Sequence, residues 1–318
     1  MIIQIVTPAP PNARNGNRMT ALRWARLLRR QGHRVRIKQL YDGRACDLLI
    51  ALHALRSHES IRRYREKRPG APLVVVLTGT DLYRDIRKNS RARESLELAT
   101  RLVVLQKKAR EELPPRLRRR TRVIYQSAER LRGAPPKADT TFKVCVVGHL
   151  RREKDPMRTA MAVRLLPLSS RINVLHIGRA LTREMQRRAS RESARNERYT
   201  WLGPLPHGRT RRVMARCHLV SLTSRMEGSS NVLSEAIASS VPVVASKIPG
   251  LMGTLGNGYP GYFPVGNARA LARLLARAEA SRRFYLKLKR ACARLAPLVE
   301  PASESRSLSR LLGELPGR

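Results

Sequence analysis

The chain has 318 residues, more than a single hydrophobic core usually serves, so we expect two α/β domains. Its 65 lysines and arginines against 23 aspartates and glutamates give a net charge of +42, which favours anionic ligands without identifying one. Only 4% of residues are aromatic and the arginines are spread along the whole chain, so a dedicated nucleic-acid reader is not expected. Membrane contact through the basic surface is not expected either.

The apolar residues and the cysteines narrow the class of protein further. Apolar residues fall in short runs, none of the eighteen or more that span a membrane, and the N-terminus lacks the pattern of a secretory signal. The four cysteines, Cys46, Cys145, Cys217 and Cys292, are far apart and form no Cys-x-x-Cys pair. We therefore expect a cytoplasmic protein with reduced thiols and no zinc site.

Short β-branched runs alternate with segments of helical periodicity, which is typical of parallel sheets with crossover helices. A helix is predicted from Asn17 to Gln31, with Leu22, Ala25 and Leu28 on one face and Gly32 as its C-terminal stop. In the first half we predict strands near Ile2–Val6, Arg34–Lys38, Asp47–Leu52, Leu73–Leu77, Leu102–Leu105 and Val123–Tyr125.

The best domain boundary lies between Arg130 and Thr141, where there is no apolar period and two prolines interrupt regular structure. A second series of strands is predicted near Phe142–Val147, Ile172–Ile177, Tyr199–Leu202, Leu219–Leu222 and Val241–Ala245. We expect a first Rossmann-like domain over residues 1–138, a second over 139–296, and a C-terminal helix over 297–318 that returns to the first domain.

The segment Glu227-Gly228-Ser229-Ser230-Asn231-Val232-Leu233-Ser234-Glu235-Ala236 lies between two predicted strands and is expected to open a helix. Free N–H groups at a helix start suit a diphosphate, and the glycine lets a ligand approach the backbone. Glu235 can accept hydrogen bonds from a ribose diol, and Glu227 can reach a hexose hydroxyl. Alternatively, the three polar residues between the glutamates only cap an ordinary helix.

A second cationic turn, Gly148-His149-Leu150-Arg151-Arg152-Glu153-Lys154, follows the strand at Val144–Val147. Ligands of doubly wound sheets bind beyond the carboxyl ends of the strands, where this turn and the helix start after Glu227 are both expected. Arg151 and Lys154 can neutralise a leaving diphosphate there.

The loop after the first strand carries Arg14, Asn15, Gly16, Asn17 and Arg18. Its glycine and the backbone N–H groups that follow can cradle an anion, and its two arginines can hold a phosphate-like acceptor. His53, at the end of the third strand, is expected to be a satisfied structural histidine.

These motifs together resemble the donor domain of GT-B retaining, GT4-like glycosyltransferases of the glycogen-synthase and sucrose-synthase type, over residues Val144 to about Val265. The resemblance implies two Rossmann-like parallel-sheet domains facing a central cleft. It also places Thr80 and Asp81, in the turn Thr78-Gly79-Thr80-Asp81-Leu82, on the acceptor side. The donor-binding residues it implies are Gly148, Gly228, Ser229, Ser230, Asn231, Val232 and Glu235, and the catalytic ones are Glu227, Lys154 and Arg151.

Within that group, the segment from Glu227 to Ala236, with Ser246-Lys247-Ile248-Pro249-Gly250 and residues 258–266, resembles the selenosugar synthases of selenoneine biosynthesis. The implied reaction joins selenophosphate to the anomeric carbon of a UDP-sugar such as UDP-N-acetylglucosamine. It releases UDP and, after loss of phosphate, gives a 1-selenosugar. The sequence contains no Asp-x-Asp motif, so we expect no metal and no cofactor besides the UDP-sugar co-substrate.

Two other functions stay open at this point. The same fold can serve a hydroxyl acceptor on a sugar or lipid. Alternatively, the chain is a non-catalytic polyanion-binding protein that has kept a degenerate donor cleft. An assay of UDP release with selenium and hydroxyl acceptors separates these readings.

Overall fold

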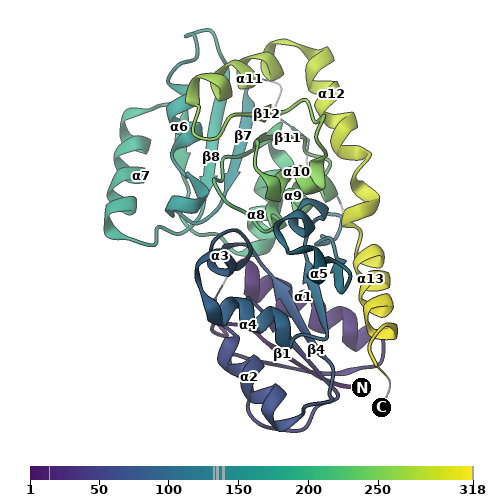
Figure 1. The fold of residues 1–318 in the computed structure, drawn as a ribbon. Coiled ribbons are helices and arrows are strands. Elements are labelled where there is room, and N and C mark those ends of the chain that lie inside the picture. Colours follow the sequence, from purple (N-terminus) through teal and green to yellow (C-terminus); the bar gives the residue numbers. More distant parts are fainter. Residues whose placement is uncertain (14, 132, 134–135, 138–139, 317–318) are drawn as a thin grey trace. The chain divides into compact units, whose positions relative to one another are not determined.

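The computed structural model describes residues 1–13, 15–131, 133, 136–137 and 140–316. The chain forms two compact units (Figure 1). The first comprises Met1–Ser127, Glu227–Ser230 and Pro301–Arg318, and the second comprises Ala128–Met226 and Asn231–Glu300. The boundary predicted at residues 138 and 139 falls outside the described residues. Among the described residues, no helix is both long and apolar enough to span a membrane.

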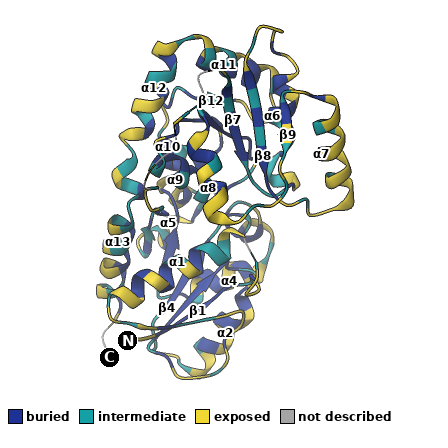
Figure 2. Cartoon of the chain, turned by 180° about the vertical axis from the view of Figure 1, so that it is seen from behind, coloured by how far each residue is buried: buried dark blue, intermediate teal, exposed yellow. Residues whose placement is uncertain are grey.

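The first unit is built on a parallel sheet whose described strands run in the order β2-β1-β3-β4-β5-β6. The strands predicted here are confirmed, with ends shifted by one or two residues in three of them. They are β1 (Ile2–Val6), β2 (Arg34–Lys38), β3 (Leu48–Leu52), β4 (Leu73–Leu77), β5 (Arg101–Val104) and β6 (Thr121–Val123). Both faces of β3 and β4 are buried, as expected of parallel strands covered by helices (Figure 2).

The first helix, α1 (Gly16–Arg30), forms as expected, but its buried face differs from the predicted one at Leu22. Leu22 is 44% exposed, whereas Trp24 is fully buried with Ala21, Ala25 and Leu28. The large aromatic ring gains more by leaving water, and it turns the helix so that Leu22 faces outward. Gly32 follows with φ of 84°, the left-handed conformation that ends a helix. The other helices of this unit are α2 (His58–Lys67), η1 (Asp81–Asp85), α3 (Ile86–Lys88), α4 (Ser90–Leu98), η2 (Lys107–Glu112) and α5 (Pro115–Arg118).

The C-terminal helix α13 (Pro301–Gly313) belongs to this unit and contacts α1 through a buried carboxylate. Glu304 is 1% exposed and accepts hydrogen bonds from Trp24 Nε1 and Arg23 Nε, each at 2.7 Å, and from Ser127 N at 2.9 Å. A buried charge is tolerated only when it is paired and hydrogen-bonded, and Glu304 meets both conditions.

The second unit contains a parallel sheet whose described strands run in the order β12-β11-β10-β7-β8-β9. The five predicted strands are confirmed, and the short β12 was not predicted, because two residues after Pro260-Gly261 carry no periodicity. The strands are β7 (Phe142–Val147), β8 (Ile172–Ile177), β9 (Tyr199–Trp201), β10 (Leu219–Leu222), β11 (Val243–Ser246) and β12 (Tyr262–Phe263). The helices are η3 (Arg152–Lys154), α6 (Arg158–Val163), α7 (Arg183–Arg195), α8 (His207–Arg216), α9 (Asn231–Ala238), α10 (Pro249–Leu255), α11 (Ala268–Ala280), α12 (Arg282–Ala293) and η4 (Ala296–Val299).

The strand order fixes where each sheet can bind a ligand. In the first sheet β2 is added on one side of β1, and β3 and the later strands are added on the other side. In the second sheet β8 and β9 lie on one side of β7, and β10 and the later strands lie on the other side. At such a switch point the two neighbouring strands send their connections to opposite faces, so a crevice opens beyond their carboxyl ends. The segments that follow β1, β3, β7 and β10 are therefore the ones that the fold sets beside a ligand.

Candidate functional site

In the first unit, the loop after β1 leads into a capped helix. Asn15 is the N-cap of α1, and its Oδ1 accepts a hydrogen bond from Arg18 N at 3.1 Å. Gly16 and Asn15 are exposed, while Asn17 and Arg18 are half-buried. Arg18 Nε is buried and has no hydrogen-bond partner among the described residues. Arg14, predicted to hold an acceptor, lies outside the described residues.

The turn after β4 in the same unit is held by a buried carboxylate. Asp81 is fully buried and accepts hydrogen bonds from Gly79 N at 2.8 Å, Thr78 N at 2.9 Å and Ala54 N at 3.0 Å. The N–H groups of this turn are therefore used within the protein. Asp81 fixes the shape of the turn, and Thr80, the other member of the predicted acceptor pair, is half-buried.

His53 follows β3 and is 2% exposed, with a left-handed backbone at φ of 77°. Its Nδ1 accepts from Arg56 N at 3.2 Å, which leaves Nε2 to donate to Thr80 Oγ1 at 2.9 Å when the ring is neutral. Both ring nitrogens thus have partners, as the sequence analysis expected of a structural histidine. Its hydrogen bond orients the Thr80 hydroxyl.

In the second unit, the turn from Gly148 to Asp155 follows β7 at the switch point. It is tied to the residues after the neighbouring strand β10: Thr223 Oγ1 donates to Lys154 O at 2.9 Å, and Arg225 N donates to Glu153 O at 2.8 Å. Arg151 is exposed and Lys154 is half-buried. The two predicted cations therefore lie beyond the carboxyl ends of β7 and β10, on a turn that is fixed by backbone hydrogen bonds.

The same turn depends on a glycine that the sequence analysis did not single out. A Cβ on Gly178, which follows β8, would lie 1.9 Å from the carbonyl oxygen of Gly148. Gly148 N in turn donates to Ile177 O at 2.9 Å. Only a glycine lets the end of β8 approach the start of the cationic turn this closely. Nothing in the sequence around Gly178 distinguishes it from an ordinary turn glycine.

Helix α9 begins at Asn231, within the segment that was expected to open a helix, and carries Glu235 one turn from its start. The Glu235 side chain is 14% exposed, and its Oε1 lies 2.8 Å from His207 Nε2 at the start of α8. The sequence analysis missed His207, because its contact with Glu235 joins residues 28 positions apart. The dipeptide Pro206-His207 at a helix start was the only available signal.

The remaining donor residues belong to two groups. Glu227, Gly228, Ser229 and Ser230 connect β10 to α9 in the chain, but they group with the first unit. There a Cβ on Gly228 would lie 2.2 Å from the carbonyl oxygen of Thr78. Glu227 is 9% exposed and Ser230 is 3% exposed, and both have interaction partners. Asn231 and Val232 start α9 in the second unit and are half-buried. Among the described residues, no three His, Cys, Asp or Glu side chains gather as metal ligands do.

The sequence profile of the family described as glycosyl transferases group 1 matches residues 127–295. The chain belongs to this family. The match covers the whole second sheet, including the turn after β7 and the start of α9, and the family membership makes the chain a glycosyltransferase. No curated protein matches the sequence.

Solved structures with this fold are similar over nearly the whole chain. HepE from Anabaena, in complex with UDP, has a TM-score of 0.76 at 17% identity, covering 99% of both chains. Sucrose-phosphate synthase from Thermosynechococcus elongatus has a TM-score of 0.78 at 17% identity, covering 99% of this chain and 98% of its own. A glycosyltransferase from Rickettsia africae has a TM-score of 0.73 at 12% identity, with 99% and 98% covered. The two-sheet GT-B architecture expected from the sequence is thus confirmed.

Proposed function

We propose that this glycosyltransferase uses a UDP-sugar as donor and selenophosphate as acceptor, and so makes a 1-selenosugar for selenoneine biosynthesis. One observation supports the proposed use of a UDP-sugar donor most strongly. The turn with Arg151 and Lys154 is hydrogen-bonded to the residues after β10, at the switch point of the second sheet. Solved structures of HepE contain UDP and UDP-glucose, which fits a nucleotide-sugar donor for this fold.

Each donor residue has a role that its chemistry suits. The start of α9 offers backbone N–H groups and the positive end of a helix dipole to the diphosphate. Arg151 and Lys154 neutralise the charge that develops on the UDP leaving group. Glu235 accepts hydrogen bonds from the ribose hydroxyls, with His207 holding its Oε1 and leaving Oε2 for the ligand. Glu227 is proposed to contact the hexose.

The acceptor half rests on the resemblance of the Glu227–Ala236 segment to selenosugar synthases. It is supported by Arg18, whose buried Nε has no partner among the described residues and can donate to an anion. In the proposed reaction, the selenium of selenophosphate forms a bond to the anomeric carbon, and the bond from that carbon to the UDP oxygen breaks, its electron pair leaving with UDP. Water then cleaves the Se–P bond and releases phosphate. Because selenium is already a strong nucleophile, no general base is required.

The test incubates the full-length protein with UDP-N-acetylglucosamine or UDP-glucose and with selenophosphate, thiophosphate or a hydroxyl sugar. UDP release is measured, and products are identified by mass. We expect a selenium-bearing hexose and selenophosphate-dependent UDP release. UDP release with hydroxyl acceptors alone would overturn the acceptor assignment and leave the donor assignment intact.

The donor assignment is tested separately by calorimetric titration with UDP. Glu235→Ala should weaken UDP binding about 30-fold, since a hydrogen bond to a charged group is worth about 2 kcal/mol. The matched control is Glu184→Ala, which removes an exposed carboxylate from α7 in the same unit. Equal affinities for both variants would contradict the ribose role of Glu235.

A further inference from the structure

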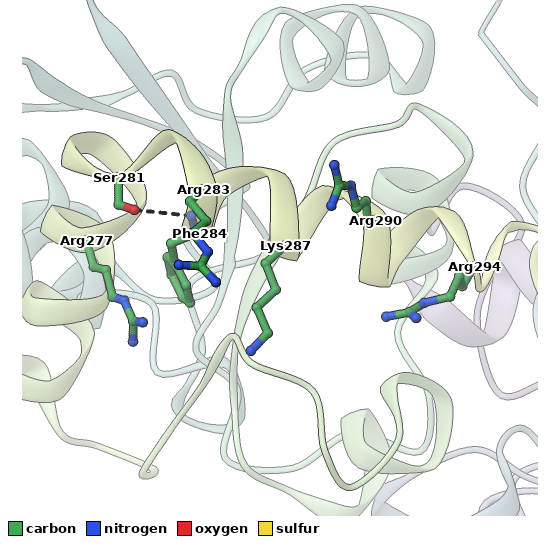
Figure 3. A pocket seen from close by; sticks show the side chains of 7 residues that line it. All are labelled: Arg277, Ser281, Arg283, Phe284, Lys287, Arg290 and Arg294. Atoms are coloured by element: carbon green, nitrogen blue, oxygen red, sulfur yellow. Dashed lines mark hydrogen bonds between the residues drawn. The ribbon is translucent and has the colours of Figure 1, made fainter.

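A hollow of about 550 Å³ lies along the end of α11 and the length of α12 in the second unit, and none of the residues proposed to meet donor or acceptor lines it (Figure 3). Five of its lining side chains are positive and none is negative. Its lining residues are Arg277, Ser281, Arg283, Phe284, Lys287, Arg290 and Arg294. We call this hollow the cationic groove.

Four of these cations come from one side of α12. Arg283, Lys287, Arg290 and Arg294 are spaced by four, three and four residues along α12 and its C-cap, so they recur about once per helical turn. At about 100° per residue their Cα atoms stay within a narrow sector of the helix surface. This row of backbone positions is roughly 16 Å long, and the side chains spread from it in different directions (Figure 3).

These cations are available to a ligand. All five charged residues of the cationic groove are exposed, and none forms an ion pair with another residue in the described ranges. By contrast, Arg164 and Arg122 of other surfaces pair with Glu192 and Glu314 at 2.9 Å and 2.6 Å. Arg277 lies over the Phe284 ring, 4.3 Å from its centre, which holds the guanidinium in place and leaves its edge free to donate.

The composition of the groove also indicates what does not bind there. Three apolar residues of α12, Phe284, Leu288 and Cys292, are buried in the unit, and Leu286 is half-buried. None of the large exposed hydrophobic residues of the described chain lies on α11 or α12, so the groove offers no apolar anchor for a bilayer. Among its lining residues there is no exposed aromatic ring on which a nucleobase can stack, so a nucleic acid would be held there through its phosphates and not through its bases.

We propose that the cationic groove binds the phosphate backbone of a single-stranded nucleic acid, contacting phosphates and reading no bases. A row of exposed cations that recur about once per helical turn along a groove fits a linear polyanion, whereas a membrane presents a plane. This electrostatic site is independent of the proposed glycosyl transfer.

The experiment measures binding of fluorescein-labelled twelve-residue oligouridylate and oligoadenylate to the full-length protein by anisotropy, at 50 to 200 mM KCl. Four phosphate contacts to a single strand predict a contribution of about −2.8 to the slope of log affinity against log salt. That slope corresponds to a loss on the order of 50-fold across this salt range. Replacing Arg283, Lys287, Arg290 and Arg294 with glutamine should remove this contribution, equally for both oligonucleotides.

Two matched variants distinguish binding in the cationic groove from attraction by the net positive charge of the whole protein. Replacing Arg187, Arg188, Arg191 and Arg195 of α7 with glutamine removes the same charge from an exposed helix of the same unit (Figure 2). This variant should change affinity less than 3-fold. A variant with Arg283, Arg290 and Arg294 changed to lysine keeps the charge and should keep the slope.

Several outcomes would overturn the proposal. The first two are an equal loss of oligonucleotide affinity in the α7 variant and a loss in the lysine variant as large as in the glutamine variant of the groove. The other two are a tenfold difference in affinity between the two oligonucleotides and an unchanged affinity in the glutamine variant of the groove. Binding to phosphatidylglycerol vesicles is measured in parallel. Groove-dependent vesicle binding with groove-independent RNA binding would assign the surface to membranes instead.

Discussion

The turn after β4 in the first unit and the turn after β7 in the second both follow a buried strand of a parallel sheet. They are nevertheless held in shape by different hydrogen-bonding groups. In the first, the Asp81 carboxylate accepts from the backbone N–H groups of Thr78 and Gly79 and neutralises the turn from inside. In the second, Thr223 Oγ1 and Arg225 N donate to the carbonyl oxygens of Lys154 and Glu153 and fix the backbone of the turn that carries the two cations of the proposed diphosphate site. The difference teaches that one βα turn is held through its N–H groups and the other through its carbonyl groups.

The largest effect is expected when the internal carboxylate is removed. Asp81→Ala leaves three buried N–H groups without acceptors and should lower the free energy of unfolding of the first unit by about 4 kcal/mol. The chain has two tryptophans, and Trp24 lies in this unit, so urea unfolding in a Trp201→Phe background reports on it. Asp42→Ala, which removes a carboxylate from the surface of the same unit, should cost less than about 1 kcal/mol. If both variants cost the same, the carboxylate does not hold the turn.

The stability of the turn after β7 should instead depend on the absence of a side chain at Gly178. In Gly178→Ala the new methyl group meets the Gly148 carbonyl and should destabilise the second unit by about 2 kcal/mol. Hydrogen exchange of β7 and β8 measures this loss, and exchange of β1 and β3 should stay unchanged. Gly208→Ala in α8 is the matched control, since a Cβ there meets nothing within 4 Å. Unchanged protection of β7 and β8 in Gly178→Ala would show that the turn can move aside.

The smallest effect concerns pH and a histidine beneath the second turn. Burial lowers the pKa of His176, in β8, to about 4 from its ordinary value of 6.5. Between these values the unfolded chain binds the proton and the folded one does not, so stability falls as pH falls from 6.5 towards 4. The slope contributed is about 1.4 kcal/mol per pH unit. Hydrogen exchange of β8 at pH 7 and pH 5 measures it. His176→Gln should show a flatter pH dependence, and the same slope in both proteins would exclude His176 as its source.

Much of the fold was predictable because buried parallel strands have short apolar runs and amphipathic helices have apolar residues at helical spacing. Both patterns can be recognised in the local sequence. Strands β1, β2, β4, β8 and β10 were located with both ends correct. The two-residue strand β12 and the outward turn of Leu22 were not, because the first has no period and the second depends on where Trp24 packs.

The candidate site divides in the same manner. The sequence by itself determined which residue types we propose for nucleotide-sugar binding. They are the cations after β7, the polar start of α9 and Glu235 one turn inside it, because helix starts and their spacing are local properties. Only the tertiary structure decided that the turn after β7 is tied to the end of β10, that His207 holds Glu235, and that Gly178 must lack a side chain. Those contacts join residues 28 to 72 positions apart, and their geometry is set by the sheet order and by close packing, which no local pattern encodes.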